Sequence, residues 1–120
     1  MRDAEPDPES LLPLQPAVFH ILVALAEGDR HGYSIMQDVA ARTDGKLRMS
    51  PGTLYGSIKR MLADGLIIEV EERPDPDNHD ERRRYYRLTP FGRQVAAADA
   101  ARLQKVLNQA RASGLVPKRS

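Results

Sequence analysis

The sequence predicts a mainly α fold that contains one small β-hairpin. Apolar residues recur at helical spacing in three short segments between residues 16 and 65, each bounded by residues that start or stop a helix. After Gly65 the apolar period changes from 3.6 to 2, which is typical of strands. Helical spacing returns at Pro90 and continues almost to Gly114, so a long helix is expected to follow the hairpin.

The composition is that of one small globular domain. The chain has 120 residues, of which 41% are hydrophobic, enough for a modest core. No apolar run reaches the roughly 20 residues of a membrane span, and the acidic, proline-bearing N-terminus is unlike a signal peptide. We therefore expect a cytoplasmic protein without membrane contact. The absence of cysteine excludes disulfides, thiolate nucleophiles and cysteine-ligated metals.

The first helix is expected to follow a disordered acidic tail. Residues 1–10 hold prolines and carboxylates that offer nothing to bury. A helix over residues 16–27 then has Pro16 at its first position and ends before Gly28. One apolar stripe of this helix consists of Val18, Ile21, Leu22 and Leu25. A second stripe consists of Phe19, Val23 and Ala26. Because one small core does not cover both stripes, the second is expected to face another subunit or another helix.

Two further helices are expected, over residues 31–43 and from Ser50 to Gly65. Ser50 is a good N-cap, Pro51 fits the first helical position, and Gly65 fits the position after the C-cap. The residues at helical spacing are Tyr33, Met36 and Val39 or Ala40 in the first of these helices, and Leu54, Ile58, Met61 and Leu62 in the second. Three short helices in succession favour helix-turn-helix packing.

Residues 66–73 and 82–89 read as the two strands of the hairpin. In the first strand, Leu66, Ile68 and Val70 alternate with Ile67, Glu69 and Glu71. In the second strand, Tyr86 and Leu88 alternate with Tyr85 and Arg87. The connection, residues 74–81, is so polar that we expect a solvent-exposed loop.

The long C-terminal helix is expected to begin with Thr89 as its cap and to reach residue 113. Its apolar positions follow spacings of 4, 3, 4 and 3 residues and are Ala96, Ala100, Leu103, Leu107 and Ala110. This heptad-like seam favours a partner helix, as in a dimer. The alternative interpretation is one long helix that folds against its own domain.

Charge is segregated along the chain, although the net charge is only +1. Residues 46–60 carry four basic and no acidic residues, residues 61–81 one basic and eight acidic, and residues 82–120 ten basic and one acidic. The pattern favours separate basic and acidic faces, of which the basic one suits a polyanion. Ordinary solvated helix faces explain the charges equally well.

The order of three helices and a hairpin is that of a winged helix, and three stretches resemble the PadR family of bacterial transcriptional regulators. They are HGYSIMQDV at 31–39, SPGTLYGSIKRMLADGLI at 50–67 and ERRRYYRLTPFGRQV at 81–95. The resemblance implies a dimeric DNA-binding repressor whose third helix enters the major groove, whose hairpin is the wing and whose C-terminal helix dimerises. The short C-terminal part resembles the branch with a single such helix.

The resemblance divides the chain into four parts. Residues 1–10 are the tail, 11–89 the winged-helix DNA-binding domain, 90–114 the dimerisation helix and 115–120 a flexible tail. The expected dimer contacts are the seam residues together with Phe19 and Val23 of the first helix.

Gly56 is the most unusual position of the third helix, because a glycine inside a helix costs roughly 1 kcal/mol relative to alanine. The family commonly has a proline there. At 100° per residue, Gly56 is central to the arc opposite the apolar stripe. The bare position either lets the backbone approach a groove wall or relieves a clash against the second helix.

The residues around Gly56 supply the expected DNA contacts. Lys59 and Arg60 are candidates for guanine or phosphate contacts, and Thr53 and Ser57 for phosphate contacts. The remaining candidates on this helix are Ser50, chiefly a cap, and Tyr55, which either contacts a phosphate or packs against the hairpin. On the wing, Arg83 and Arg84 are expected to face the DNA backbone, whereas Arg82 either does so or pairs with the acidic loop.

No other chemistry is indicated. His20, His31 and His79 lack the spacing of metal ligands, and His31 is expected to order the start of the second helix. No phosphate-binding loop or catalytic set is present, so we expect no enzyme and no cofactor. The alternative function is a winged-helix module that binds protein through its acidic segments. The resemblance also implies small-molecule sensing at a dimer interface, but six aromatic residues and no tryptophan identify no inducer.

Overall fold

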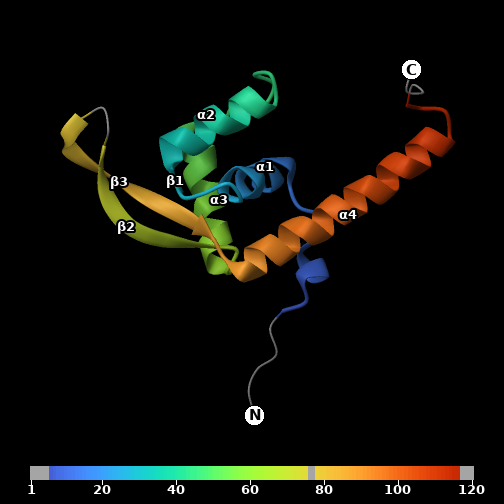
Figure 1. Cartoon of the computed structure of the whole chain (residues 1–120), viewed down its shortest axis with the longest axis horizontal. Coiled ribbons are helices and arrows are strands. Elements are labelled where there is room, and N and C mark those ends of the chain that lie inside the picture. The colour runs from blue at the N-terminus through green and yellow to red at the C-terminus, as the bar shows by residue number, and fades with distance from the viewer. Residues whose placement is uncertain (1–5, 76–77, 117–120) are drawn as a thin grey trace, which may run out of the picture.

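The computed structural model describes residues 6–75 and 78–116, and of residues 71–75 and 78–82 it describes the backbone alone. The described helices and strands are a 3-10 helix η1 (Pro8–Leu11), α1 (Pro16–Leu25), β1 (Arg30–His31), α2 (Gly32–Arg42), α3 (Pro51–Ala63), β2 (Ile67–Asp75), β3 (Asn78–Leu88) and α4 (Pro90–Ala112). Figure 1 shows α1, α2 and α3 gathered at the centre, with the long hairpin on one side and α4 projecting on the other. The predicted mainly α fold with a small hairpin is confirmed.

The sheet has a third strand that the sequence does not predict. Its order is β1-β3-β2, and both pairings are antiparallel. β1 is only two residues long, and its His31 pairs with Tyr85 of β3. Because α2 begins at the next residue, this short strand fixes the start of α2 against the hairpin.

The loop predicted for residues 74–81 is wrong for most of its length. β2 continues to Asp75 and β3 begins at Asn78, and these two residues are paired. The register shifts between Val70 and Arg73 and again between Pro74 and Asp75. Backbone pairing therefore overrides the polar composition of this segment, and the remaining part of the predicted loop, residues 76–77, lies outside the described residues.

The core lies where α1, α2 and α3 meet the hairpin and the start of α4. Its buried apolar residues are Val18, Ile21, Leu22, Leu25, Ile35, Val39, Leu54, Ile58, Met61, Leu66, Ile67, Tyr86, Leu88 and Val95. The stripes predicted for the first and third helices are thus confirmed, except that Leu62 is half-buried. In α2, Ile35 and Val39 are buried while Tyr33 is 49% exposed, so Tyr33 does not belong to the buried stripe.

The predicted helix ends are confirmed in detail. Ser50 Oγ accepts a hydrogen bond from the Thr53 amide at 3.2 Å, and Thr89 Oγ1 accepts one from the Gly92 amide at 2.9 Å. At the end of α3, Gly65 has φ of +76° and the Leu66 amide donates to the Met61 carbonyl at 2.9 Å. This hydrogen bond, between residues five positions apart, is the one that defines a Schellman motif. The motif ends α3 and directs the chain into β2.

The expected disordered tail is shorter than predicted, because Pro8–Leu11 forms a 3-10 helix. The Asp7 carboxylate accepts from the Glu9 amide at 2.9 Å and so caps this turn. Leu11 and Leu12 pack against the core, and η1 lies against α4. The apolar leucines that follow the acidic residues thus anchor the segment. Residues 1–5 lie outside the described residues.

α4 belongs to the domain only at its beginning. Gly92, Val95 and Asp99 are buried, and no described residue after Asp99 is. The Asp99 side chain is 1% exposed, and its Oδ1 accepts from Arg102 Nε at 2.7 Å. Beyond this ion pair the helix extends away from the body (Figure 1). The alternative of one long helix folded against its own domain is therefore wrong for most of α4.

Candidate nucleic-acid interface

One face of α3, the free face, is exposed to solvent. Opposite the buried stripe lie Thr53, Gly56, Lys59 and Arg60, all exposed. A Cβ added to Gly56 would meet no atom within 4 Å. The interpretation that Gly56 relieves a clash against the second helix is therefore wrong, and the glycine leaves a gap on the exposed surface of α3.

Ser50 and Ser57 are the other predicted contacts on α3 that carry hydroxyls. Ser50 is exposed at the N-terminus of α3, where its Oγ caps the helix and also donates to Thr53 Oγ1 at 3.1 Å. Ser57 is half-buried beside Gly56. Both hydroxyls thus lie at the edge of the exposed face, with Ser50 engaged as the predicted cap.

Tyr55 contacts the start of α2 and leaves half of its surface in solvent. A Cβ added to Gly32 would overlap the Tyr55 hydroxyl and lie 2.9 Å from the ring carbon Cζ, so the phenol ring lies against this glycine. Tyr55 is nevertheless 50% exposed. The ring therefore packs against the start of α2, and Tyr55 also lies close enough to Tyr86 of the hairpin to contribute, besides burial, to the raised pKa of Tyr86.

The wing arginines divide between the two faces of β3. The Arg83 guanidinium lies over the Tyr33 ring, 5.5 Å from its centroid, whereas Arg84 lies 3.7 Å from the Glu69 carboxylate. Alternation along a strand sends these neighbours to opposite faces. Arg83 is thus on the face of β3 that meets Tyr33 at the start of α2. The side chain of Arg82 lies outside the described residues.

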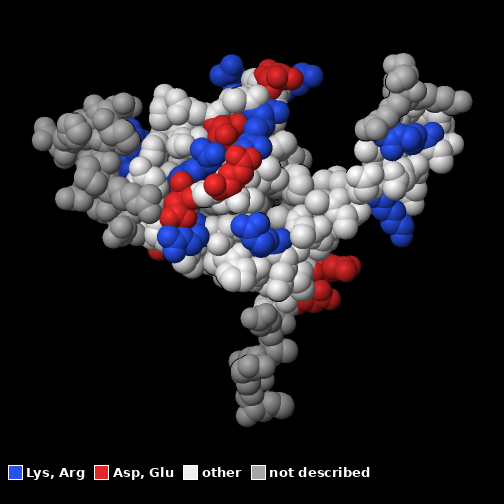
Figure 2. Space-filling view, in the orientation of Figure 1, with Lys and Arg blue, Asp and Glu red and all other residues white. Residues whose placement is uncertain are grey.

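A band of mixed charge covers α2 and β1 (Figure 2). Arg42 pairs with Asp38 and Glu27, and Arg87 donates to both carboxylate oxygens of Asp29 at 2.9 and 2.8 Å. The hydrogen bonds from Arg42 to these two carboxylates raise its pKa further above the ordinary value. The prediction of separate basic and acidic faces is wrong for this face, because folding pairs residues that are far apart in sequence.

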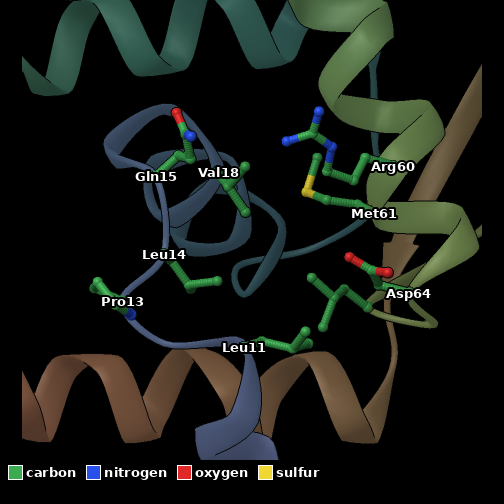
Figure 3. A pocket seen from close by; sticks show the side chains of 9 residues that line it. Leu11, Pro13, Leu14, Gln15, Val18, Arg60, Met61 and Asp64 are labelled. Carbon is green, nitrogen blue, oxygen red and sulfur yellow. The ribbon is translucent and has the colours of Figure 1, made fainter.

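A groove of about 290 Å³ runs between the start of α1 and the free face of α3. Its lining residues are Gln15, Ala17, Val18, Gly52, Thr53, Gly56, Ser57 and Arg60. It adjoins a smaller pocket that shares Gln15, Val18 and Arg60 and is also lined by Asp64 (Figure 3). Gln15 and Gly52 were not predicted from the sequence. Gly52 had a signal, since it lies four residues before Gly56 and so on the same face of the helix.

The predicted dimer residues fall into two groups. Phe19, Val23 and Ala96 are partly buried within the chain itself, and Ala96 packs against the core. Ala100 is exposed on α4, Ala110 is half-buried, and Leu103 and Leu107 are 41% and 40% exposed. Val106, which the heptad pattern did not include, is 49% exposed beside them. The projecting half of α4 therefore carries an apolar surface.

Tyr86 of β3 is buried, and its phenol has a raised pKa. The residue is 3% exposed, and this burial, together with the nearby Glu69 carboxylate, raises the pKa of Tyr86 above its ordinary value. Its role is in the core rather than at the interface.

Two kinds of feature are absent from the described residues. Within residues 6–75 and 78–116, no three His, Cys, Asp or Glu side chains come together as a possible metal site. No helix in the part of the chain that the structure describes is long and apolar enough to cross a membrane.

Comparisons with known proteins agree with this architecture. A family model described as the transcriptional regulator PadR-like family matches residues 21–98. The transcriptional regulator Rv3488 of Mycobacterium tuberculosis is 33% identical over 90 residues, which cover 75% of this chain and 78% of that protein. A transcriptional regulator from Clostridium thermocellum superposes with a TM-score of 0.64 at 29% identity, over 77% of this chain and 89% of the other.

Two further solved structures share the fold. A PadR family transcription regulator from Clostridium difficile R20291 has a TM-score of 0.63 and 26% identity, over 79% of this chain and 97% of the other. Bacillus subtilis PadR in complex with operator DNA has a TM-score of 0.60 and 20% identity, over 72% of this chain and 47% of the other.

Proposed function

We propose that this chain, which belongs to the transcriptional regulator PadR-like family, acts as a homodimeric repressor that binds a partly palindromic operator. The observation that carries the proposal is the free face of α3. Hydroxyl, amine and guanidinium groups surround the bare Gly56 there, while the opposite face is buried in the core. A helix with this division presents one polar face to a major groove, which is wide enough to admit an α-helix.

Gly56 has a specific use in this arrangement. Without a Cβ, the backbone of α3 comes closer to the groove wall than any other residue would allow. Lys59 and Arg60 then reach base edges or phosphates, and Thr53 and Ser57 supply hydroxyls for the flanking backbone.

The wing supplies contacts that position the protein on the duplex. Arg83 and Arg84 lie on opposite faces of β3. When the protein binds a duplex, only one of the two side chains therefore faces the DNA backbone. Arg83 is the stronger candidate, because its guanidinium lies over the Tyr33 ring at the start of α2. Arg84 lies near Glu69, whose carboxylate would repel a phosphate.

The homodimer is supported by the apolar surface of the projecting α4. Exposed leucines and a valine on a helix that leaves its own domain need cover from another molecule. A second copy that packs α4 against α4, with Phe19 and Val23 at the edge, gives two copies of α3 related by a two-fold axis. Such a dimer reads half-sites about one helical turn apart.

Fluorescence anisotropy with a labelled duplex from the chain's own upstream region, at several salt concentrations, tests the proposal. If each dimer neutralises about six phosphates, the slope of log K against log salt should be near −5. A slope near zero on every sequence would contradict DNA binding and favour the alternative of a winged-helix module that binds protein.

A further inference from the structure

We propose that the groove between α1 and α3 holds one phosphodiester of the DNA backbone and that Gln15 donates to it. This inference rests on the proposed function, because it names a contact on the face by which the protein would meet DNA. It adds α1 to the DNA-binding surface, which otherwise consists of α3 and the wing.

The groove has the composition of an anion site. Arg60 contributes a full positive charge, Gln15 an amide, and Thr53 and Ser57 two hydroxyls. None of the described residues that line the groove is acidic, although Asp64 lines the adjoining smaller pocket, which Arg60 also lines. A phosphodiester accepts hydrogen bonds from such donors, and the guanidinium favours its charge.

The floor of the groove is open because two glycines lie one helical turn apart on α3. A Cβ at Gly56 would meet nothing within 4 Å, and the nearest atom to a Cβ at Gly52 would be Ser50 Oγ at 4.0 Å. Neither glycine is therefore required by packing within the chain. The whole groove, of about 290 Å³, is large enough for a phosphate group.

Donors from the start of α1 and from α3 line this space. Figure 3 shows the Arg60 guanidinium extending from α3 toward α1, on the side where the Gln15 amide lies. Gln15 is the N-cap residue of α1 but makes no side-chain capping hydrogen bond, so its amide is not used by the helix. Thr53 Oγ1 accepts from Ser50, which leaves its own proton to donate.

The arrangement separates the roles of two adjacent cations. Arg60 lies on the shoulder of α3 that faces α1, and Lys59 lies 100° away on the other shoulder. If Arg60 binds the phosphate in the groove, Lys59 is the cation of α3 that remains for a base edge.

Two substitutions of Gln15 test the proposal on a duplex that the parent protein binds. Gln15→Ala removes the amide, and we expect affinity to fall roughly threefold to tenfold on all sequences alike. Gln15→Glu places a carboxylate beside the phosphate, so we expect a larger loss and a salt slope less steep by about 1. A carboxylate is favourable at the N-terminus of α1, so lower stability would not explain this loss.

The matched control is Gln109→Glu, which makes the same change of charge at an exposed position near the end of α4. It should leave affinity and slope at parental values. Ethylation interference gives a second readout, since one phosphate in each half-site should lose its effect in Gln15→Ala.

The outcomes separate this inference from the proposed function. If the parent binds DNA with a steep salt slope while Gln15→Glu behaves like Gln109→Glu, the groove does not hold a phosphate and the proposed function stands. If the parent fails to bind DNA at all, the proposed function itself is overturned.

Discussion

The guanidinium of Arg83 lies 5.5 Å from the centre of the Tyr33 ring, within the range of a cation–π interaction. Arg83 is in β3 and Tyr33 is the second residue of α2, so the contact joins the wing to the helix-turn-helix. Tyr33 is 49% exposed, which is why its ring is available to the arginine. The contact holds the guanidinium against the start of α2.

Replacement of Tyr33 should therefore affect DNA binding through Arg83. Tyr33→Ala removes the ring beneath the guanidinium, and affinity should fall severalfold, because about 0.5 to 1 kcal/mol is typical of such contacts at exposed sites. Tyr33→Phe keeps the ring and should retain parental affinity. Anisotropy titrations of both variants, and of each combined with Arg83→Ala, measure the effect. Equal losses in the presence and absence of Arg83 would show that Tyr33 acts independently of it.

Gly56→Ala should raise stability and lower DNA affinity. The added Cβ meets no atom within 4 Å, and alanine is favoured over glycine inside a helix by roughly 0.5 to 1 kcal/mol. The same methyl group would hold the helix away from a groove wall. Urea denaturation and anisotropy titration of the variant measure the two effects separately. A more stable variant with unchanged affinity would mean that the bare surface is not used.

The sequence predicted the features that depend on neighbouring residues. Ser50, Thr89 and Gly65 each act within a few residues, so their roles follow from local rules. Features that depend on distant residues were missed or misread. β1 exists because residues 30–31 pair with β3, Tyr33 faces outward because it meets Arg83, and Arg87 pairs with Asp29 58 positions away. None of these partners is marked by a local pattern.

The candidate site shows the same division. Periodicity placed Gly56, Lys59 and Arg60 on the free face of α3, because the helical angle between residues is fixed. The groove beside them also needs the start of α1, which only the tertiary fold brings near. Gln15 carries no signal in the sequence, since an isolated glutamine before a helix has no distinctive spacing.

Glutamate at both Leu103 and Leu107 should dissociate the proposed dimer. Each leucine contributes about 2 kcal/mol when fully buried, and two glutamates in each subunit would place four charges in the interface without partners. Sedimentation should show a monomer, and operator affinity should fall toward that of one half-site.

The control for this pair is the double replacement of Ala101 and Gln109 by glutamate. Both residues are exposed and lie on the face of α4 opposite the seam, so this variant should remain dimeric. A Leu103 and Leu107 variant that stays dimeric with parental affinity would show that the subunits meet elsewhere.

Stability should fall at alkaline pH through Tyr86. Burial and the Glu69 carboxylate raise the pKa of its phenol, so the folded state binds this proton more tightly than the unfolded state. The resulting stabilisation is fully present below the ordinary tyrosine pKa of about 10 and is lost as the pH rises through the folded-state value. Urea denaturation between about pH 8 and 11 should show a smaller decline for Tyr86→Phe than for the parent. An equal decline in stability for the parent and Tyr86→Phe would show that the Tyr86 phenol does not cause the loss of stability at alkaline pH.

The central claim is that a symmetric dimer reads DNA through α3, and selection of bound duplexes from a random-sequence pool tests it most directly. The parent should enrich an inverted repeat whose half-sites are about one helical turn apart. Selection with Lys59→Ala should relax the preference at one position in each half-site, whereas Arg60→Ala should weaken binding without changing the profile. Failure of the parent to enrich any sequence would contradict readout by α3, and the same profile from the parent, Lys59→Ala and Arg60→Ala would contradict base contacts from this helix.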